Sequence, residues 1–384
     1  MKILMVSIPN HHFFQWVNQL SDAGHDVYWF DISDSSTKSE RTKWLNQIQN
    51  WKLRWDFPGR KILKIKFPKI YTIIQKVNDR KLEDYFEEIL KQIEPEIVHS
   101  FAMQLSCVPI LEVMKRYPKA KWIYSSWGSD IFLHEQLGIT KFQFKDVLKR
   151  INYLITDCER DHQIALQNGF INQFLGVFMG NGGLDINKNL ILSSDQRNVF
   201  LIKGYEDGIG KALQIIEAIE LLPLELFHNL EIIIYSADLK IKEKLESSEF
   251  FKDLDVKIYL RGQFISNDLL LQTMGRSILH IANSISDGLP TSGVEAMGMG
   301  AFPIQSNPGN VSEEVITHGK SGYLITNPFD IKEIAEHIQN ALENKELREI
   351  AKKYNVNFVD QNFNRERLKK EIIKLYEDIY KKYN

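Results

Sequence analysis

Short apolar segments of β type alternate with amphipathic helical segments along both halves of the chain. This alternation predicts parallel sheets whose strands are joined by crossover helices. In the first half, the pattern predicts strands at 3–7, 26–30, 97–100, 122–125 and 154–157, and helices at 14–23 and 84–92. In the second half, it predicts strands at 199–203, 231–235, 256–260, 279–282 and 301–305, and helices at 210–222, 267–276, 294–299 and 331–343.

The length of 384 residues is enough for two domains, each with its own core. A polar stretch around 192–197 separates the two series of elements. We therefore expect an α/β protein with a Rossmann-like domain at 1–190 and a second one at 191–364. The last helix, at 365–384, is a candidate to pack across both domains. Two such domains imply a ligand cleft at the carboxyl ends of their strands.

Composition excludes several classes of protein. Hydrophobic residues make up 43% and charged residues 26%, which is typical of globular domains and not of disordered chains. The 48 basic and 50 acidic residues nearly balance, so no overall field favours nucleic acid. The cysteines, Cys107 and Cys158, lack metal-site spacing and fit a reducing cytoplasm. With no leader-like start and no apolar run of ~18 residues, we expect neither secretion nor a membrane span.

One stretch departs from this balance. Residues 38–81 hold thirteen Lys and Arg against three acidic residues, interleaved with Trp and other aromatic side chains. Cations and aromatics together are typical of a peripheral contact with anionic lipid. The alternative is that the aromatics belong partly to the core and the cations form a solvated face. Nucleic-acid binding is a poorer account, because no reader motif accompanies the charges.

The most informative segment for chemistry is 283–300. Asp287 lies in a loop rich in Gly, Pro, Ser and Thr, and Glu295 follows in the predicted helix, with seven residues between them. A loop of small residues before a helix start can offer backbone N–H groups and a positive dipole to an anion. A carboxylate one turn further on can accept hydrogen bonds from a vicinal diol such as ribose. The alternative is a solvated turn with a capping acid.

This segment resembles the E-x7-E region of the retaining glycosyltransferases of family 4, which have the GT-B fold. Further matches lie in register along the chain. They are Gly262 and Phe264 after a strand, the helix start Glu295-Ala296-Met297, the strand at 298–304, the link Asn181-Gly182-Gly183-Leu184-Asp185, and Trp127-Gly128-Ser129-Asp130 as a W-G-S-D variant of an N-terminal motif.

The resemblance implies a retaining, metal-independent transferase that moves a hexosyl group from a UDP- or GDP-sugar to a hydroxyl acceptor, with no cofactor beyond this co-substrate. It assigns Glu295 to the ribose and Asp287 to the transferred sugar. Asp287 is a departure, because the family has Glu there. The donor would also contact Gly262, Phe264, Gly288, Leu289, Pro290, Thr291 and Ser292.

The family supplies cations for the diphosphate through a G-R-L…K-G pattern after the first strand of the second domain. Here Tyr205 stands at the Arg position and Gly210 at the Lys position. Lys203 and Lys211 remain as candidates for donor binding. The alternative for each is an ordinary solvated lysine.

In the first domain, His12 resembles a His-containing start of some family members and is a candidate catalytic residue. The alternative is a helix-capping or surface histidine. Trp127 replaces the family's common His, and Trp127 and Asp130 are candidates for acceptor binding.

We therefore expect a cytoplasmic enzyme, with a peripheral membrane contact through 38–81, that acts on a glycan or lipid-linked acceptor in surface polysaccharide synthesis. The competing class is a catalytically degenerate binder of sugar or nucleotide. A dehydrogenase is a weaker third option: Asp31 ends the second strand as a ribose binder would, but no G-x-G-x-x-G follows 3–7. The base, sugar, acceptor and oligomeric state stay open.

Overall fold

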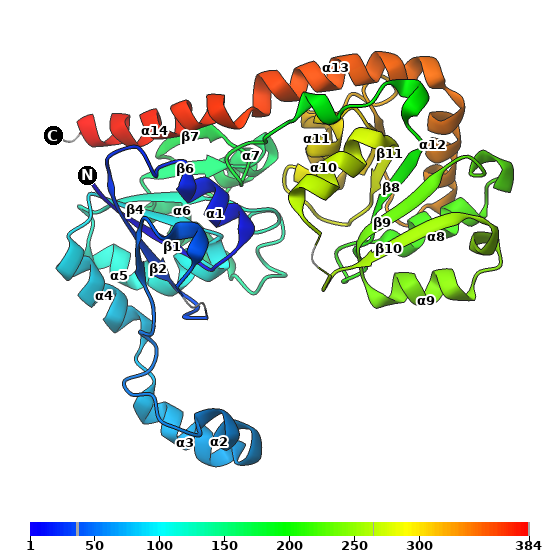
Figure 1. Cartoon of the computed structure of the whole chain (residues 1–384). Helices are drawn as coiled ribbons and strands as arrows, with labels where there is room; N and C mark the ends of the chain where they lie inside the picture. Colours follow the sequence, from blue (N-terminus) through cyan, green and yellow to red (C-terminus); the bar gives the residue numbers. More distant parts are fainter. Residues whose placement is uncertain (36–37, 264, 383–384) are drawn as a thin grey trace. The chain divides into compact units, whose positions relative to one another are not determined.

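A computed structural model describes residues 1–35, 38–263 and 265–382. The chain divides into two compact units, each built on a parallel sheet with helices on both faces, which confirms the predicted α/β fold (Figure 1). The first unit contains residues 1–157 and 161–182 and the chain from Leu368 onward. The second contains 158–160 and 183–367, so the change of unit falls at Gly183, a few residues before the expected position near 190.

The first unit has a seven-stranded sheet in the order β3-β2-β1-β4-β5-β6-β7. Its strands are Lys2–Ser7 (β1), Asp26–Asp31 (β2), Asn46–Ile48 (β3), Ile97–Phe101 (β4), Lys121–Ser125 (β5), Tyr153–Thr156 (β6) and Gln173–Val177 (β7). Its helices are His11–Asn18 (α1), Arg60–Lys66 (α2), Pro68–Asn78 (α3), Leu82–Ile93 (α4), Leu111–Arg116 (α5), Lys141–Arg150 (α6), Glu159–Gln167 (α7) and, at the end of the chain, Arg365–Lys381 (α14). The first residues of α7, up to Arg160, and those of α14, up to Arg367, belong to the second unit.

Alternation along β1 divides the core of this unit into two layers. Leu4 and Val6 pack with buried residues of α4, α5 and α6. Ile3 and Met5 pack on the opposite face with α1 and α14. Successive side chains of a strand point to opposite faces, so each strand supplies both layers.

Helix α14 is therefore part of the core of the first unit. Its residue Tyr376 is fully buried, and the Tyr376 hydroxyl accepts a hydrogen bond from Trp16 Nε1 at 3.0 Å. The same hydroxyl lies 2.6 Å from His99 Nδ1 in β4. Burial lowers the pKa of His99 to about 3, so this histidine is a neutral member of the network.

The second unit has a six-stranded sheet in the order β10-β9-β8-β11-β12-β13. Its strands are Val199–Lys203 (β8), Glu231–Ala237 (β9), Asp255–Leu260 (β10), Ser277–Ala282 (β11), Phe302–Ser306 (β12) and Tyr323–Ile325 (β13). Its helices are Ala212–Glu220 (α8), Leu239–Ser247 (α9), Asn267–Arg276 (α10), Thr291–Gly298 (α11), Ile331–Glu343 (α12) and Lys345–Phe363 (α13). Residues of α8, α9 and α12 share one core cluster, and residues of α10 and α11 share another.

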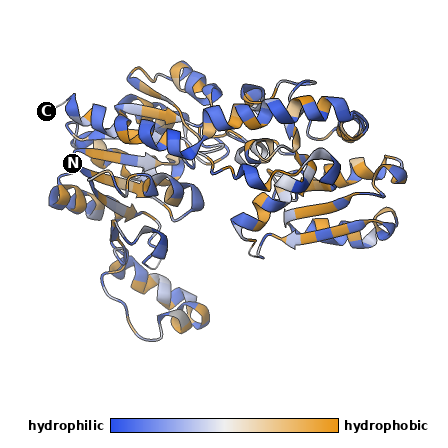
Figure 2. Ribbon diagram, turned by 45° about the horizontal axis from the view of Figure 1, so that its top comes forward, coloured by the Kyte–Doolittle hydropathy of each residue, from blue (hydrophilic) through white to orange (hydrophobic). Residues whose placement is uncertain are grey.

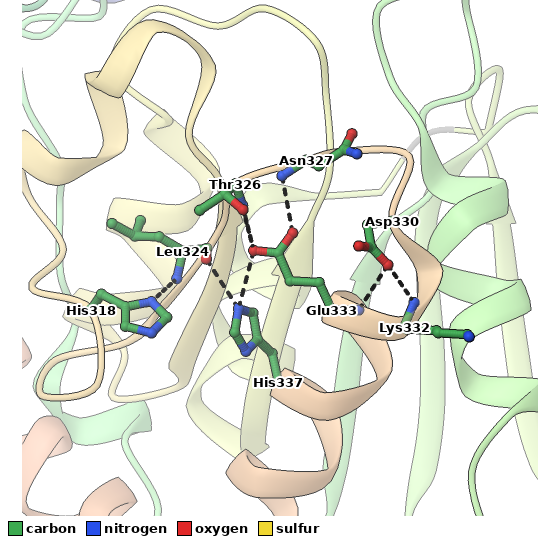
Figure 3. A network of polar contacts seen from close by, with 8 residues as sticks. All are labelled: His318, Leu324, Thr326, Asn327, Asp330, Lys332, Glu333 and His337. Carbon is green, nitrogen blue, oxygen red and sulfur yellow. Dashed lines mark hydrogen bonds and ion pairs between the residues drawn. The ribbon is translucent and has the colours of Figure 1, made fainter.

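The connection from β13 to α12 is fixed by Glu333 (Figure 3). The Glu333 carboxylate accepts hydrogen bonds from Thr326 N at 2.8 Å, Thr326 Oγ1 at 2.6 Å and Asn327 N at 3.0 Å. His337, one turn further along α12, places Nε2 at 3.1 Å from the Leu324 carbonyl. These bonds satisfy backbone groups that the three-residue strand leaves without a partner in the sheet.

Candidate functional site

The loop from β11 to α11 is held by polar contacts of its first residues. Asn283 Nδ2 donates to the carbonyls of Lys211, at 3.1 Å, and Pro328, at 2.8 Å. The backbone N–H of Ser284 donates to Ser306 Oγ at 2.9 Å. These bonds join the ends of three neighbouring connections, and they fix where the loop carrying Asp287 begins.

Helix α11 begins at Thr291, three residues before the predicted start at 294. Pro290 occupies the N-cap position, and its side chain offers no acceptor to the helix. The first intrahelical acceptor is the Pro290 carbonyl, which Val294 N reaches at 3.0 Å. The N–H groups of residues 291–293 therefore point out of the first turn with a partial positive charge, as an anion site requires.

The two predicted carboxylates lie on either side of this helix start. Asp287 is half-buried in the loop, and Glu295 is half-buried in the second turn of α11. Burial raises the pKa of Glu295 to about 7, against the opposing effect of Arg365. Burial also raises the pKa of Asp287, while Lys203 and the Gly288 N–H favour its charged form. Two raised carboxyl pKa values in one loop and helix are typical of functional sites.

The backbone at Asp287 is held by Arg160, which sequence reasoning missed. Arg160 Nη2 donates to the Asp287 carbonyl at 2.9 Å, and Nη1 donates to the Pro308 carbonyl at 2.9 Å. The charge of Arg160 also favours the ionised form of Asp287, which opposes the rise in pKa that burial causes. Arg160 lies about 130 residues before Asp287 in the sequence. No local sequence pattern could therefore have linked it to the loop.

A buried polar pair lies next to the first turn of α11. Tyr235 Oη is 2.9 Å from His280 Nε2, and both side chains are buried. Burial, with the charge of Lys203, lowers the His280 pKa to about 3, so the ring is neutral. Burial raises the pKa of the Tyr235 hydroxyl, and the nearby Ser292 side chain opposes that shift. The Ser292 hydroxyl oxygen is itself buried.

Tyr205, at the family's Arg position, lies beside two cations. Lys203 Nζ is 4.7 Å from the centre of the Tyr205 ring, and the guanidinium carbon of Arg261 is 4.2 Å from it. Arg261 Nη1 donates to Asp207 Oδ2 at 2.7 Å. Sequence reasoning missed Arg261, although it follows β10 directly and precedes the predicted Gly262.

The family's Lys position is closed to a side chain here. A Cβ on Gly210 would collide with the Tyr205 carbonyl, so only glycine fits. The cation is displaced by one residue to Lys211, whose Nζ donates to the Gly208 carbonyl at 2.8 Å. Lys211 is thus bound to its own loop, whereas the charge of Lys203 favours the ionised form of Asp287 and opposes the rise in pKa that burial causes.

The other predicted donor contacts differ in what their side chains can offer. Leu289 and Pro290 are buried, so these two residues could reach a donor mainly through their backbone. Gly262 has open space where a Cβ would be, and Phe264 lies outside the described residues. Gly288 donates its N–H toward the Asp287 carboxylate, and Thr291 begins α11.

In the first unit, two residues that were predicted separately lie together. The ring of His12 is 6.0 Å from the ring of Trp127. Helix α1 begins at His11 and not at 14, and its N-cap is Asn10, whose Oδ1 accepts from Phe13 N at 2.8 Å. The alternative that His12 caps the helix is therefore wrong.

Asp130 is buried and holds its own loop. Its Oδ1 accepts from Trp127 N at 3.1 Å, and its Oδ2 accepts from Met103 N and Tyr124 Oη, both at 2.7 Å. Burial raises the Asp130 pKa to about 7. An acceptor could contact this carboxylate only by replacing one of these bonds, so Asp130 acts in this structure by positioning Trp127.

Family models match both units. Residues 211–358 match the model described as glycosyl transferases group 1, and residues 81–158 match the model described as glycosyl transferase 4-like. Spore coat protein SA of Bacillus subtilis (strain 168) is 37% identical over 83 residues. That match spans 22% of this chain and 22% of the length of the relative.

Solved structures show the same fold over the whole chain. Sucrose-phosphate synthase from Thermosynechococcus elongatus aligns with a TM-score of 0.71 at 16% identity, over 99% of both chains. Anabaena HepE in complex with UDP-glucose aligns with a TM-score of 0.67 at 14% identity, over 98% of this chain and 100% of that one. The architecture is that of the GT-B class. Within this class, the two family models indicate a GT-B glycosyltransferase of the family-4-like type.

Proposed function

We propose that this protein is a retaining glycosyltransferase. It moves a sugar from a nucleotide diphosphate donor, UDP- or GDP-linked, to a hydroxyl of a glycan or lipid-linked acceptor, as a step of surface polysaccharide synthesis at the cytoplasmic side of a membrane. The segment Trp127 to Asp130 serves as a variant of the family's N-terminal motif. The reaction needs no metal and no cofactor beyond the donor itself.

The observation that carries this proposal is the start of α11 with its two carboxylates. The N–H groups of residues 291–293 supply a site for the donor's phosphates. Glu295, four residues after Thr291, accepts hydrogen bonds from the ribose hydroxyls once it is ionised. Burial removes water from the Glu295 carboxyl and raises its pKa to about 7. Hydrogen bonds from the ribose would replace that lost water and stabilise the ionised form.

Departure of the diphosphate requires positive charge at the leaving oxygen. Lys203 is suited to this task, because its charge already acts on the Asp287 carboxyl. Arg261, beside the same Tyr205 ring, is the second cation and takes the place of the family's Arg. Lys211 contributes less, since its Nζ is held by the Gly208 carbonyl.

In the transfer step, the bond between the anomeric carbon and the phosphate oxygen breaks, and the electron pair stays on the phosphate. The acceptor hydroxyl oxygen bonds to the same face of the anomeric carbon, and its proton passes to the leaving phosphate. The Asp287 carboxylate stabilises the positive charge that develops on the sugar ring. Atoms and charge balance without a further reactant.

The test is calorimetry with UDP, GDP and their sugar conjugates on the wild-type chain and on Glu295→Ala. We expect one nucleotide series to bind, with affinity reduced about tenfold or more in the variant. Glu243→Ala, an exposed carboxylate on α9, is the matched control and should bind as the wild type does. Equal affinity in all three proteins would contradict the ribose role.

Turnover decides between the enzyme and the degenerate binder. The departures at Asp287, Tyr205 and Trp127 are the observations that favour a binder. Gly210 adds to them, because Tyr205 and Gly210 stand where the family has its own cations. Donor hydrolysis or transfer, followed by nucleotide release, supports the enzyme, and an α-linked product from an α-linked donor supports retention. Binding without turnover across a range of acceptors would support the binder.

A further inference from the structure

Between β3 and α4, the chain leaves the sheet of the first unit and returns through a narrow neck. Arg54 N donates to the Asn78 carbonyl and Arg80 N donates to the Lys52 carbonyl, both at 2.8 Å. The Asn78 side chain closes the neck by donating to the Trp55 carbonyl at 2.8 Å and accepting from Trp55 N at 2.9 Å. The excursion, residues 52–81, is thus tied at its base and carries α2 and α3.

The two helices of this excursion expose large apolar side chains. Figure 1 shows α2 and α3 packed against each other at a distance from the sheet of their own unit. Ile65 is 80% exposed, Ile73 67% and Val77 65%. The apolar surface is formed by Trp55, Ile62, Ile65, Phe67, Ile70, Ile73 and Val77, each about half exposed or more. A group of this size on one structural element marks an interaction site.

Helical spacing gathers these side chains into stripes. Ile70, Ile73 and Val77 are spaced i, i+3 and i+7 along α3, which places them on one face. Lys69 and Lys76 follow the same spacing on the neighbouring face. In α2, Ile62 and Ile65 share a face in the same way. Figure 2 shows hydrophobic and hydrophilic residues interspersed along both helices.

Charge distinguishes this surface from an ordinary protein contact. Residues 52–81 hold ten Lys and Arg against two acidic residues. Arg60 pairs with Asp56 at 3.1 Å, whereas Lys64, Lys66 and Lys69 are exposed beside the apolar stripes. An apolar face bordered by cations is complementary to a layer whose interior is apolar and whose surface is anionic.

The basic stretch 38–81 had two interpretations, a contact with lipid or aromatics that belong partly to the core, and different parts of the stretch fit each one. Trp51 and Tyr71 are buried, and Trp44 Nε1 donates to Asn18 Oδ1 at 2.8 Å, so these aromatics belong to the fold. Trp55 and Phe67 are exposed and lie within the excursion. The aromatic residues Trp44 and Trp51, before position 52, are therefore structural.

We propose that the α2–α3 excursion docks on the surface of an anionic lipid bilayer. The stripes formed by Ile62, Ile65, Ile70 and Ile73 enter the interface between headgroups and acyl chains. The exposed lysines contact the lipid phosphates. With 7 and 11 residues, the helices are too short to span the hydrocarbon layer and lie along its surface. Among the described helices, none has the length and apolar character that a membrane span requires.

The experiment is sedimentation of the full chain with lipid vesicles, at low and at high salt. We expect binding to phosphatidylcholine vesicles that contain phosphatidylglycerol, weaker binding at high salt, and little binding to phosphatidylcholine alone. The double variant Ile65→Glu/Ile73→Glu should reduce the bound fraction about tenfold or more. The control Ile171→Glu, at a side chain 84% exposed elsewhere in the first unit, should bind as the wild type does.

Three results would overturn the proposal. They are no binding to anionic vesicles, equal loss in the Ile171→Glu control, and a wild-type dimer in solution that the double variant converts to a monomer. The last result would show that a second copy covers the stripes. Nucleotide affinity of the double variant should equal that of the wild type, so failure of membrane docking stays distinguishable from failure of the proposed enzymatic function.

Discussion

The guanidinium carbon of Arg261 lies 4.2 Å from the centre of the Tyr205 ring. Tyr205 follows β8 and stands where related chains are expected to carry an Arg, whereas Arg261 follows β10, which lies two positions from β8 in the sheet. The Tyr205 ring and the Asp207 carboxylate hold this guanidinium in place, and Arg261 Nη1 donates to Asp207 Oδ2 at 2.7 Å. The second unit thus keeps an arginine near this position, although its sequence has lost one there.

Replacing Arg261 by Ala should weaken nucleoside diphosphate binding about tenfold, because a charge-assisted contact to the phosphates is lost. Calorimetry with the nucleotide that the wild type binds measures this. Lys240→Ala, an exposed cation on α9, controls for the loss of one positive charge. The role of Arg261 is refuted by an affinity that falls equally in both variants, or in neither.

Glu295→Gln should remove a pH dependence of nucleotide binding. Wild-type affinity is expected to rise as pH increases through about 7, because the carboxyl whose pKa burial raises becomes a stronger, charged acceptor once it is ionised. The glutamine variant carries the same shape without this titration. Calorimetry over a pH series on both proteins measures the difference, and the variant also reports any titration of the nucleotide itself. Parallel profiles would contradict the prediction.

The same shift has a consequence for stability. A carboxyl with a raised folded pKa holds its proton in the folded state at a pH where the unfolded chain has lost it, so stability declines as pH rises toward about 7. Without nucleotide, Glu295→Gln should therefore be more stable than the wild type in mildly alkaline buffer, by of the order of 1 kcal/mol. Denaturant unfolding of the wild type and of Glu295→Gln, in acidic and in alkaline buffer, tests this. A wild-type stability that is the same in both buffers would speak against it.

Glu333→Ala should destabilise the second unit by about 2 kcal/mol at neutral pH, because Thr326 and Asn327 lose a charged acceptor. Hydrogen bonds lower the pKa of Glu333, against the effect of burial. Its contribution is therefore present above the unfolded pKa and disappears as pH falls through the lower folded value. Denaturant unfolding at neutral and acid pH measures both. Glu336→Ala, on the exposed side of the same helix, should show neither effect.

Gly210→Ala should destabilise the protein by about 2 kcal/mol, because the added Cβ meets the Tyr205 carbonyl. Gly262→Ala is the matched control, since its Cβ would enter open space. Thermal unfolding of the two variants measures the contrast. Equal melting temperatures would show that the loop after β8 relaxes easily, and that Lys at this position is excluded for another reason.

Much of the fold could be predicted, because buried parallel strands read as apolar runs and amphipathic helices keep a period near 3.6. β8, α10 and α12 have the predicted limits. The predictions missed β3, β7 and β13, which form sheet edges and are short or only half-buried. A strand with few buried positions has little hydrophobic pattern to read.

The candidate site could be predicted only where it is local in sequence. Asp287, Glu295 and the start of α11 lie within one loop and helix, so their spacing carried the information. Arg261 and Arg160 could not be found in this way, because the order of strands and a distant connection bring them to the site. Asp130 was placed in the correct loop, but its burial against Tyr124 depends on packing that no local pattern encodes.

Helix α14 has a consequence for how the chain reaches its native state. Tyr376 and its neighbours complete a core layer that begins with Ile3 and Met5, yet they follow the whole second unit in sequence. The first unit therefore cannot complete its core until α14 is available, whereas all residues of the second unit precede Leu368, which departs from the usual order in which the earlier domain folds first. A chain truncated after Arg367 should therefore have a protease-resistant second unit and a protease-sensitive first one.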